Sequence, residues 1–81
     1  MDIMKTLLLA YLSTLFIIDV ETSEPLVGVE VISQQTGKSY YTDIDGMVNI
    51  PTDSCEYYLR YISYSDTLIC GQDTLVKMKQ L

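Results

Sequence analysis

The chain has 81 residues, a length that favours one domain and leaves little room for an independent active-site cleft. Its composition is apolar enough to fold, and seven tyrosines together with many valines, isoleucines and threonines favour strands over helices. Five lysines and arginines stand against eleven acidic residues, so the net charge is −6 and no basic surface is available to follow a phosphate backbone. The charge therefore excludes nucleic acid as a partner.

The N-terminal segment, residues 1–14, is apolar and precedes a single expected β-sandwich domain, residues 15–81. Lys5 stands ahead of an apolar run, which is the pattern of a secretory signal peptide. The leucines of this segment are Leu7, Leu8, Leu9 and Leu12.

Two features of the same segment favour an alternative, in which it is retained as a strand or docking segment. Asp2 is unusual at the start of a signal peptide, and no clean cleavage site of small residues follows. An uncleaved copy must bury its leucines, and we expect it to do so against another subunit. The apolar run is shorter than the roughly 20 residues that a helix needs to cross a bilayer, so membrane association is expected to be indirect or through this segment alone.

From residue 15 onward, apolar runs alternate with turn signals at the spacing typical of a β-sandwich or barrel. No helix is expected in this part of the chain. Val27, Val29 and Val31 share one face of their strand, and Val48 and Ile50 share one face of another, so we expect both faces in the core. The seven expected strands are residues 15–20, 27–32, 39–42, 48–50, 56–63, 67–70 and 74–79.

Proline, glycine and aspartate mark the connections between these strands. The residues assigned to turns are Pro25, Gly28, Asp43, Asp45 and Gly46. The pair Asp43 and Asp45 superficially resembles part of a calcium loop, but the alternating ligands and the later glutamate of an EF-hand are absent. We therefore interpret the pair as turn-forming and expect no metal site.

Three motifs in order resemble the carboxypeptidase regulatory-like domain: EPLVGV at residues 24–29, TDIDG at 42–46 and YISY at 61–64. The resemblance implies a seven-stranded, Greek-key-type sandwich of the prealbumin-like or transthyretin-like kind. Such domains are accessory modules appended to metallocarboxypeptidases, to SusC-type TonB-dependent transporters of the outer membrane, or to other surface proteins.

The chain departs from that family pattern in three places. Residues 16–18 are apolar where a glycine usually interrupts the first strand, and Ser63 replaces the glycine before Tyr64. Third, no further domain is expected after Leu81. We therefore expect the chain to serve a separate protein or another copy of itself.

The residue types needed for common catalytic sites are missing. The chain contains no histidine, which removes the commonest general base and the usual zinc ligand. No Gly-x-Ser-x-Gly nucleophile motif and no phosphate-binding glycine loop occurs. We expect no enzyme activity and no cofactor.

The two cysteines, Cys55 and Cys70, suggest a disulfide if the chain is exported. A hairpin turning near residues 64 and 65 would instead place Cys70 opposite Arg60. The offset from Cys55 would then be ~16 Å, at ~3.3 Å per strand residue. This exceeds the ~7 Å that a disulfide can bridge between Cα atoms, so two free thiols are expected.

Tyrosines concentrate on the strand expected at residues 56–63. Tyr58, Arg60, Ile62 and Tyr64 fall on one face of that strand, and such a mixture is enriched in interaction hot spots. The alternative is ordinary cross-strand aromatic packing.

The function expected from these observations is a non-enzymatic accessory or structural interaction module. It would bind a protein partner or assemble with itself as part of a larger cell-envelope or particle assembly. The expected location is the cell envelope, at the periplasm or outer-membrane surface, or outside the cell. A carbohydrate- or ligand-binding receptor domain that uses the tyrosine-rich face is the alternative.

Overall fold

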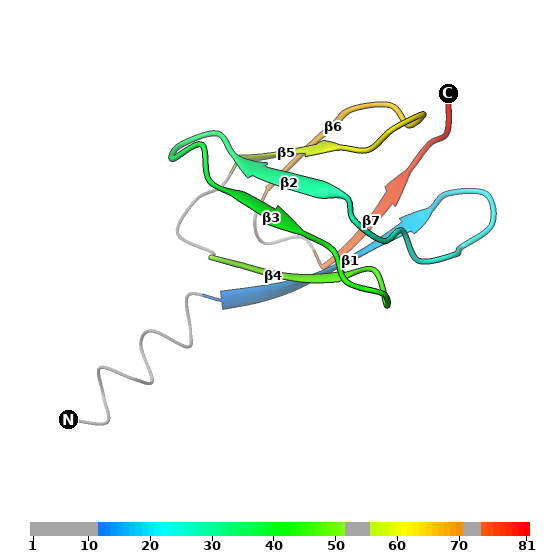
Figure 1. The fold of residues 1–81 in the computed structure, drawn as a ribbon, viewed down its shortest axis with the longest axis horizontal. Helices are drawn as coiled ribbons and strands as arrows, with labels where there is room; N and C mark the ends of the chain where they lie inside the picture. Colours follow the sequence, from blue (N-terminus) through cyan, green and yellow to red (C-terminus); the bar gives the residue numbers. More distant parts are fainter. Residues whose placement is uncertain (1–11, 52–55, 71–73) are drawn as a thin grey trace.

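The computed structural model describes residues 12–51, 56–70 and 74–81, and these ranges contain strands and turns but no helix. Seven strands lie in two sheets (Figure 1). The expected all-β class and the expected number of strands are confirmed. The strands are β1 Leu12–Asp19, β2 Glu30–Ser33, β3 Ser39–Tyr41, β4 Met47–Pro51, β5 Glu56–Arg60, β6 Thr67–Cys70 and β7 Leu75–Met78.

The first sheet has three strands in the order β4-β1-β7. Its central strand, β1, is antiparallel to β4, with Leu15 opposite Val48. On its other side β1 is parallel to β7, with Ile17 opposite Val76. The first and last of the described strands are therefore direct neighbours.

The second sheet has four antiparallel strands in the order β3-β2-β5-β6. Its register places Glu30 of β2 between Tyr41 of β3 and Arg60 of β5. These three side chains therefore share one face of the sheet, because directly opposed residues point to the same side.

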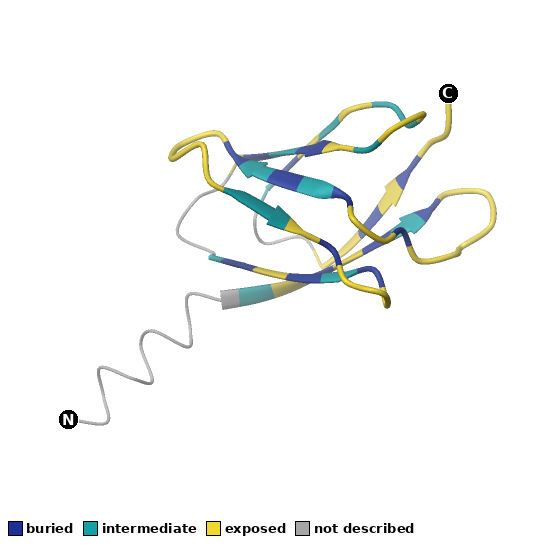
Figure 2. Ribbon diagram, in the orientation of Figure 1, coloured by how far each residue is buried: buried dark blue, intermediate teal, exposed yellow. Residues whose placement is uncertain are grey.

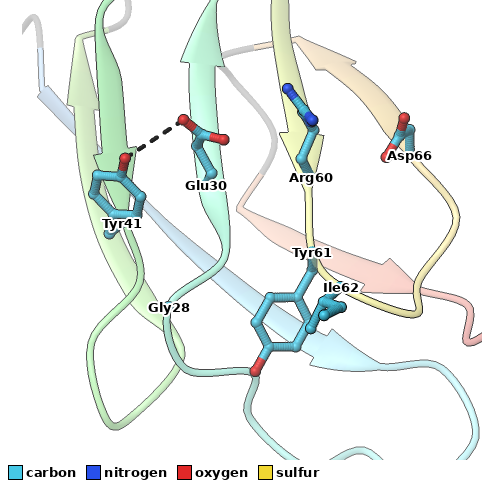
Figure 3. Close-up of a pocket in the computed structure, with 7 residues that line it drawn as sticks. All are labelled: Gly28, Glu30, Tyr41, Arg60, Tyr61, Ile62 and Asp66. Atoms are coloured by element: carbon cyan, nitrogen blue, oxygen red, sulfur yellow. Dashed lines mark hydrogen bonds between the residues drawn. The ribbon is translucent and has the colours of Figure 1, made fainter.

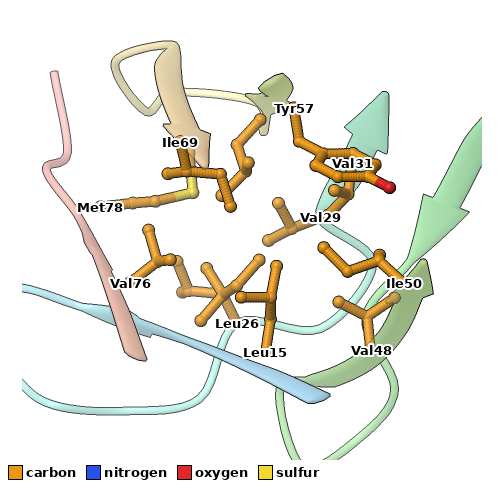
Figure 4. Packing of buried hydrophobic residues seen from close by; sticks show 12 residues of the cluster. Leu15, Leu26, Val29, Val31, Val48, Ile50, Tyr57, Ile69, Val76 and Met78 are labelled. Atoms are coloured by element: carbon orange, nitrogen blue, oxygen red, sulfur yellow. The ribbon is translucent and has the colours of Figure 1, made fainter. Parts of the chain in front are cut away.

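The core lies between the two sheets, which gives the molecule a β-sandwich-like arrangement. Buried and exposed residues alternate along the strands (Figure 2), as expected where one face of each sheet is packed. Side chains from both sheets point toward one another in the core (Figure 4). The core residues are Leu15, Ile17, Leu26, Val29, Val31, Val48, Ile50, Tyr57, Leu59, Ile69, Val76 and Met78.

The expectation that Val27 joins the valine face in the core is wrong. Val29 and Val31 are fully buried, but Val27 is 47% exposed and Leu26 takes the place in the core. The backbone turns at Gly28, whose φ is +81°, a conformation that glycine adopts without steric cost. The turn interrupts the alternation, and β2 begins only at Glu30.

The ends of two strands also differ from expectation. β1 begins at Leu12 rather than at residue 15, so the end of the apolar N-terminal segment pairs with β4. Leu7, Leu8 and Leu9 lie outside the described residues. β5 ends at Arg60 rather than at residue 63, because the chain turns at Ser63, whose φ is +68°.

The expectation of two free thiols is wrong. Cys70 is disulfide-bonded, and no free cysteine occurs among the described residues. Its strand partner is Glu56 rather than Arg60, because residues 61–66 form a longer connection than the tight hairpin turn assumed from the sequence. This register brings Cys70 opposite the neighbour of Cys55 in the sequence; Cys55 itself lies outside the described residues.

Candidate functional site

The side of the four-stranded sheet that faces away from the core carries the candidate site, which we call the outer sheet face. Alternation along β2, β3, β5 and β6 directs its side chains outward. The exposed and half-buried residues on this face include Glu30, Ile32, Tyr41, Tyr58, Arg60 and Leu68.

A shallow depression lies on the outer sheet face, toward the end where β5 stops (Figure 3). The hydroxyl of Tyr41 donates to Glu30 Oε2 at 3.4 Å, and Ser39 Oγ donates to the same oxygen at 3.0 Å. Arg60 lines the depression from the end of β5 and is exposed. The lining residues are Gly28, Glu30, Tyr41, Arg60, Tyr61, Ile62 and Asp66.

Tyr58 stands beside this depression and is held by one short hydrogen bond. Its hydroxyl donates to Asp66 Oδ2 at 2.6 Å. That bond, followed by burial and the negative charge of Asp66, raises the pKa of Tyr58, and the charge of Arg60 opposes the effect. The hydrogen bond to Asp66 therefore orients the Tyr58 ring on the same face of β5 as Arg60.

Tyr64 does not share the outer sheet face with Tyr58 and Arg60. The turn at Ser63 directs it back, and its ring packs against the core and lies 5.4 Å from the Tyr61 ring. Ile62 lies in this turn and is 84% exposed. The four residues expected on one face are thus separated. Tyr58 and Arg60 lie on β5, Ile62 lies in the turn, and Tyr64 packs against the core.

The interior contact of Tyr64 is with Asp19, a buried residue at the end of β1. The Tyr64 hydroxyl donates to Asp19 Oδ2 at 2.6 Å, and the backbone N–H groups of Glu21 and Thr22 donate to Asp19 Oδ1 at 2.7 and 3.0 Å. The hydrogen bond from Tyr64, then those from the backbone, lower the pKa of Asp19. The same bond, with burial, raises the pKa of Tyr64 to about 12.

The turn after β3 is built on Asp43. Its Oδ1 accepts the N–H groups of Asp45 and Met47 at 2.9 and 3.0 Å, the geometry of an Asx-type turn. Gly46 adopts φ +74°. A Cβ atom at Gly46 would lie 2.8 Å from the Ile17 oxygen and 2.9 Å from Pro25 Cβ, so a larger residue does not fit.

Sequence reasoning missed Thr42, which joins this turn to the segment before β2. It is buried; its Oγ1 accepts the Val29 N–H at 2.9 Å and donates to the Leu26 oxygen at 2.6 Å. The available signal was a threonine directly before the Asp-rich turn, a position where a polar side chain can bond a neighbouring backbone.

The described residues contain no group of three or more Cys, Asp or Glu side chains that could hold a metal ion. In the same residues, no helix is long and apolar enough to cross a membrane.

The comparisons with known proteins returned no relative: no family model, no curated protein and no solved structure matches the chain.

Proposed function

We propose that the chain is a non-enzymatic interaction module whose outer sheet face binds a protein partner. The observation that carries the proposal is that exposed Tyr41 and Arg60 line one depression, and that half-buried Tyr58 is hydrogen-bonded to Asp66 in the same lining. Tyrosine and arginine are the residue types enriched at the energetic centres of protein interfaces. The core lies on the opposite side of the sheet, so these three side chains take no part in it.

We further propose that the fold is a Greek-key sandwich of the prealbumin-like type, related to carboxypeptidase regulatory-like domains. Contacts between two of the three family-like motifs support this. Thr42, in the second motif, bonds to Leu26 and Val29 in the first. Gly46 approaches Pro25 closely. The first and second family-like motifs, residues 24–29 and 42–46, are thus in contact with each other.

In this proposal the module serves a larger cell-envelope or extracellular assembly. The disulfide at Cys70 supports such a location, because disulfides persist in oxidising compartments such as the periplasm and the extracellular space.

Site-specific photo-crosslinking in the producing cells tests the binding role of the outer sheet face. A photoreactive phenylalanine analogue replaces Tyr41 in one variant and Leu75, exposed on β7 of the other sheet, in a matched control. We expect a discrete crosslinked protein from position 41 that disappears with Arg60→Ala, and none from position 75. Equal crosslinking at both positions, or crosslinking from position 75 alone, would refute the proposal.

A carbohydrate receptor is the second candidate, and the composition of the depression favours it. Two tyrosine rings, Tyr41 and Tyr61, line it together with Glu30, Arg60 and Asp66. Aromatic surfaces combined with a few polar groups are typical of small-ligand sites. Binding to a glycan array that is lost with Tyr41→Ala would favour this candidate over a protein partner.

A further inference from the structure

Three loops gather at one end of the molecule, where β1, β3 and β5 end and β2 and β4 begin (Figure 1). We call residues 20–29, 42–46 and 61–66 together the loop end. The Gly28 N–H donates to the Thr42 oxygen at 3.0 Å, which joins the first loop to the second. Gly28 and Ile62 line the same depression, which joins the first loop to the third.

Each of these loops exposes a large aliphatic side chain. Val27 is 47% exposed, Ile44 is 78% exposed and Ile62 is 84% exposed. Single exposed aliphatic residues are ordinary on protein surfaces, but one on each of three connected loops at the same end of the molecule favours an interaction site. None of these three side chains contributes to the core, so core packing does not explain why these positions are aliphatic.

The same loops are uniformly acidic. They contain Glu21, Glu24, Asp43, Asp45 and Asp66, and no lysine or arginine. Asp43 and Asp45 flank Ile44 directly. Ile44 is therefore bordered by negative charge on both sides, whereas Ile62 shares its depression with Arg60 as well as with Glu30 and Asp66.

We propose that the loop end docks onto a partner protein whose surface offers an apolar patch bordered by lysine or arginine. Burial of the aliphatic side chains supplies affinity, and the opposite charges supply orientation and rapid association. A lipid surface fits less well, because insertion of Ile44 would press Asp43 and Asp45 against the headgroups. A second copy of the chain also fits less well, because it carries a net charge of −6.

The loop end shares Gly28, Ile62 and Asp66 with the depression on the outer sheet face, but Val27 and Ile44 do not line that depression, so variants at these two positions separate the two surfaces. A random dodecapeptide phage library, selected on the immobilised full chain, provides the probe. Synthetic versions of the enriched peptides are then titrated by fluorescence anisotropy. We expect enriched sequences that combine large apolar residues with lysine or arginine, and binding that weakens as salt rises.

Variants locate the binding. The double variant Val27→Ser and Ile44→Ser should weaken binding at least tenfold, whereas Leu75→Ser, a matched loss of an exposed aliphatic side chain, should not change it. Ile62 is left intact because it also lines the depression. Circular dichroism checks that each variant remains folded.

Several outcomes would overturn the inference: no enriched peptide, enriched peptides without basic residues, or unchanged affinity of the double variant. Binding lost only with Arg60→Ala would also overturn it while leaving the outer sheet face supported. Sedimentation with neutral or anionic vesicles, or dimerisation lost in the double variant, would identify a membrane or a second copy as the occupant instead.

Discussion

Tyr64 and Asp19 connect the two sheets through a single hydrogen bond between their side chains. Asp19 ends β1 of the three-stranded sheet, and Tyr64 follows β5 of the four-stranded sheet. Two backbone bonds reinforce the connection: Ser65 N–H donates to the Lys79 oxygen and Leu81 N–H to the Ser63 oxygen. The pair therefore resists separation of the sheets at this end.

The pKa values of this pair predict how stability depends on pH. Because the pKa of Asp19 is lowered on folding, its contribution is present above the ordinary aspartate range and is lost as pH falls through the folded-state pKa. The pKa of Tyr64 is raised to about 12 from 10.0, so its contribution is complete below pH 10 and declines between pH 10 and 12. Urea unfolding measured at several pH values tests both trends.

The variant Tyr64→Phe separates this pair from other titrating groups. It should lower the melting temperature at pH 7 and flatten the stability profile at both acidic and alkaline pH. Tyr41→Phe removes a hydroxyl from an exposed ring and serves as the control at pH 7. An unchanged pH profile for Tyr64→Phe would show that the bond to Asp19 contributes nothing.

The turn after β3 contains two carboxylates, Asp43 and Asp45, that differ in their contacts, so single variants of each test which one forms the turn. Asp43→Ala removes the acceptor of two backbone N–H groups and should lower the free energy of unfolding by about 1 kcal/mol. Asp45→Ala should lower the free energy of unfolding by less, because Asp45 contacts Asp43 through its backbone N–H and not through its side chain. Calcium that raised the melting temperature of the parent but not of Asp43→Ala would contradict the turn-forming role.

The early start of β1 predicts a difference between two N-terminal deletions. Removing residues 1–11 leaves β1 intact, whereas removing residues 1–14 also deletes Ser13 and Thr14, which face Ile50 and Asn49 of β4. The longer deletion should lower the free energy of unfolding by a further ~1–3 kcal/mol, at ~0.5–1.5 kcal/mol per lost hydrogen bond. Denaturation followed by circular dichroism measures it; equal stabilities would place residues 12–14 outside the folded unit.

The strands could be predicted from the sequence because burial imposes a two-residue period on them. Val29, Val31, Val48 and Ile50 were assigned to the core by that period, and all are buried. The period does not show where a strand stops. The turn at Ser63 requires a positive φ at a residue other than glycine, and no feature of the sequence marks such a residue. For this reason the sequence predicts neither the register between β5 and β6 nor the disulfide of Cys70.

The candidate site depends on the order of the strands in the sheet, and this order cannot be predicted from short stretches of the sequence. The shared face of Tyr58 and Arg60 follows from alternation along β5 alone. Their approach to Tyr41 requires the order β3-β2-β5, in which β2 separates two strands distant in the sequence. The loop end likewise arises only when three connections meet at one end of the molecule.

Nuclear magnetic resonance can show whether the outer sheet face is the binding surface. The ¹⁵N-labelled chain would be titrated with the partner identified by crosslinking at position 41, and the backbone amide shifts would be followed by residue. If the outer sheet face binds the partner, the largest amide shift changes are expected in residues 30–32, 39–41 and 58–60. Changes concentrated instead in β1 and β7, with these three ranges unaffected, would contradict it.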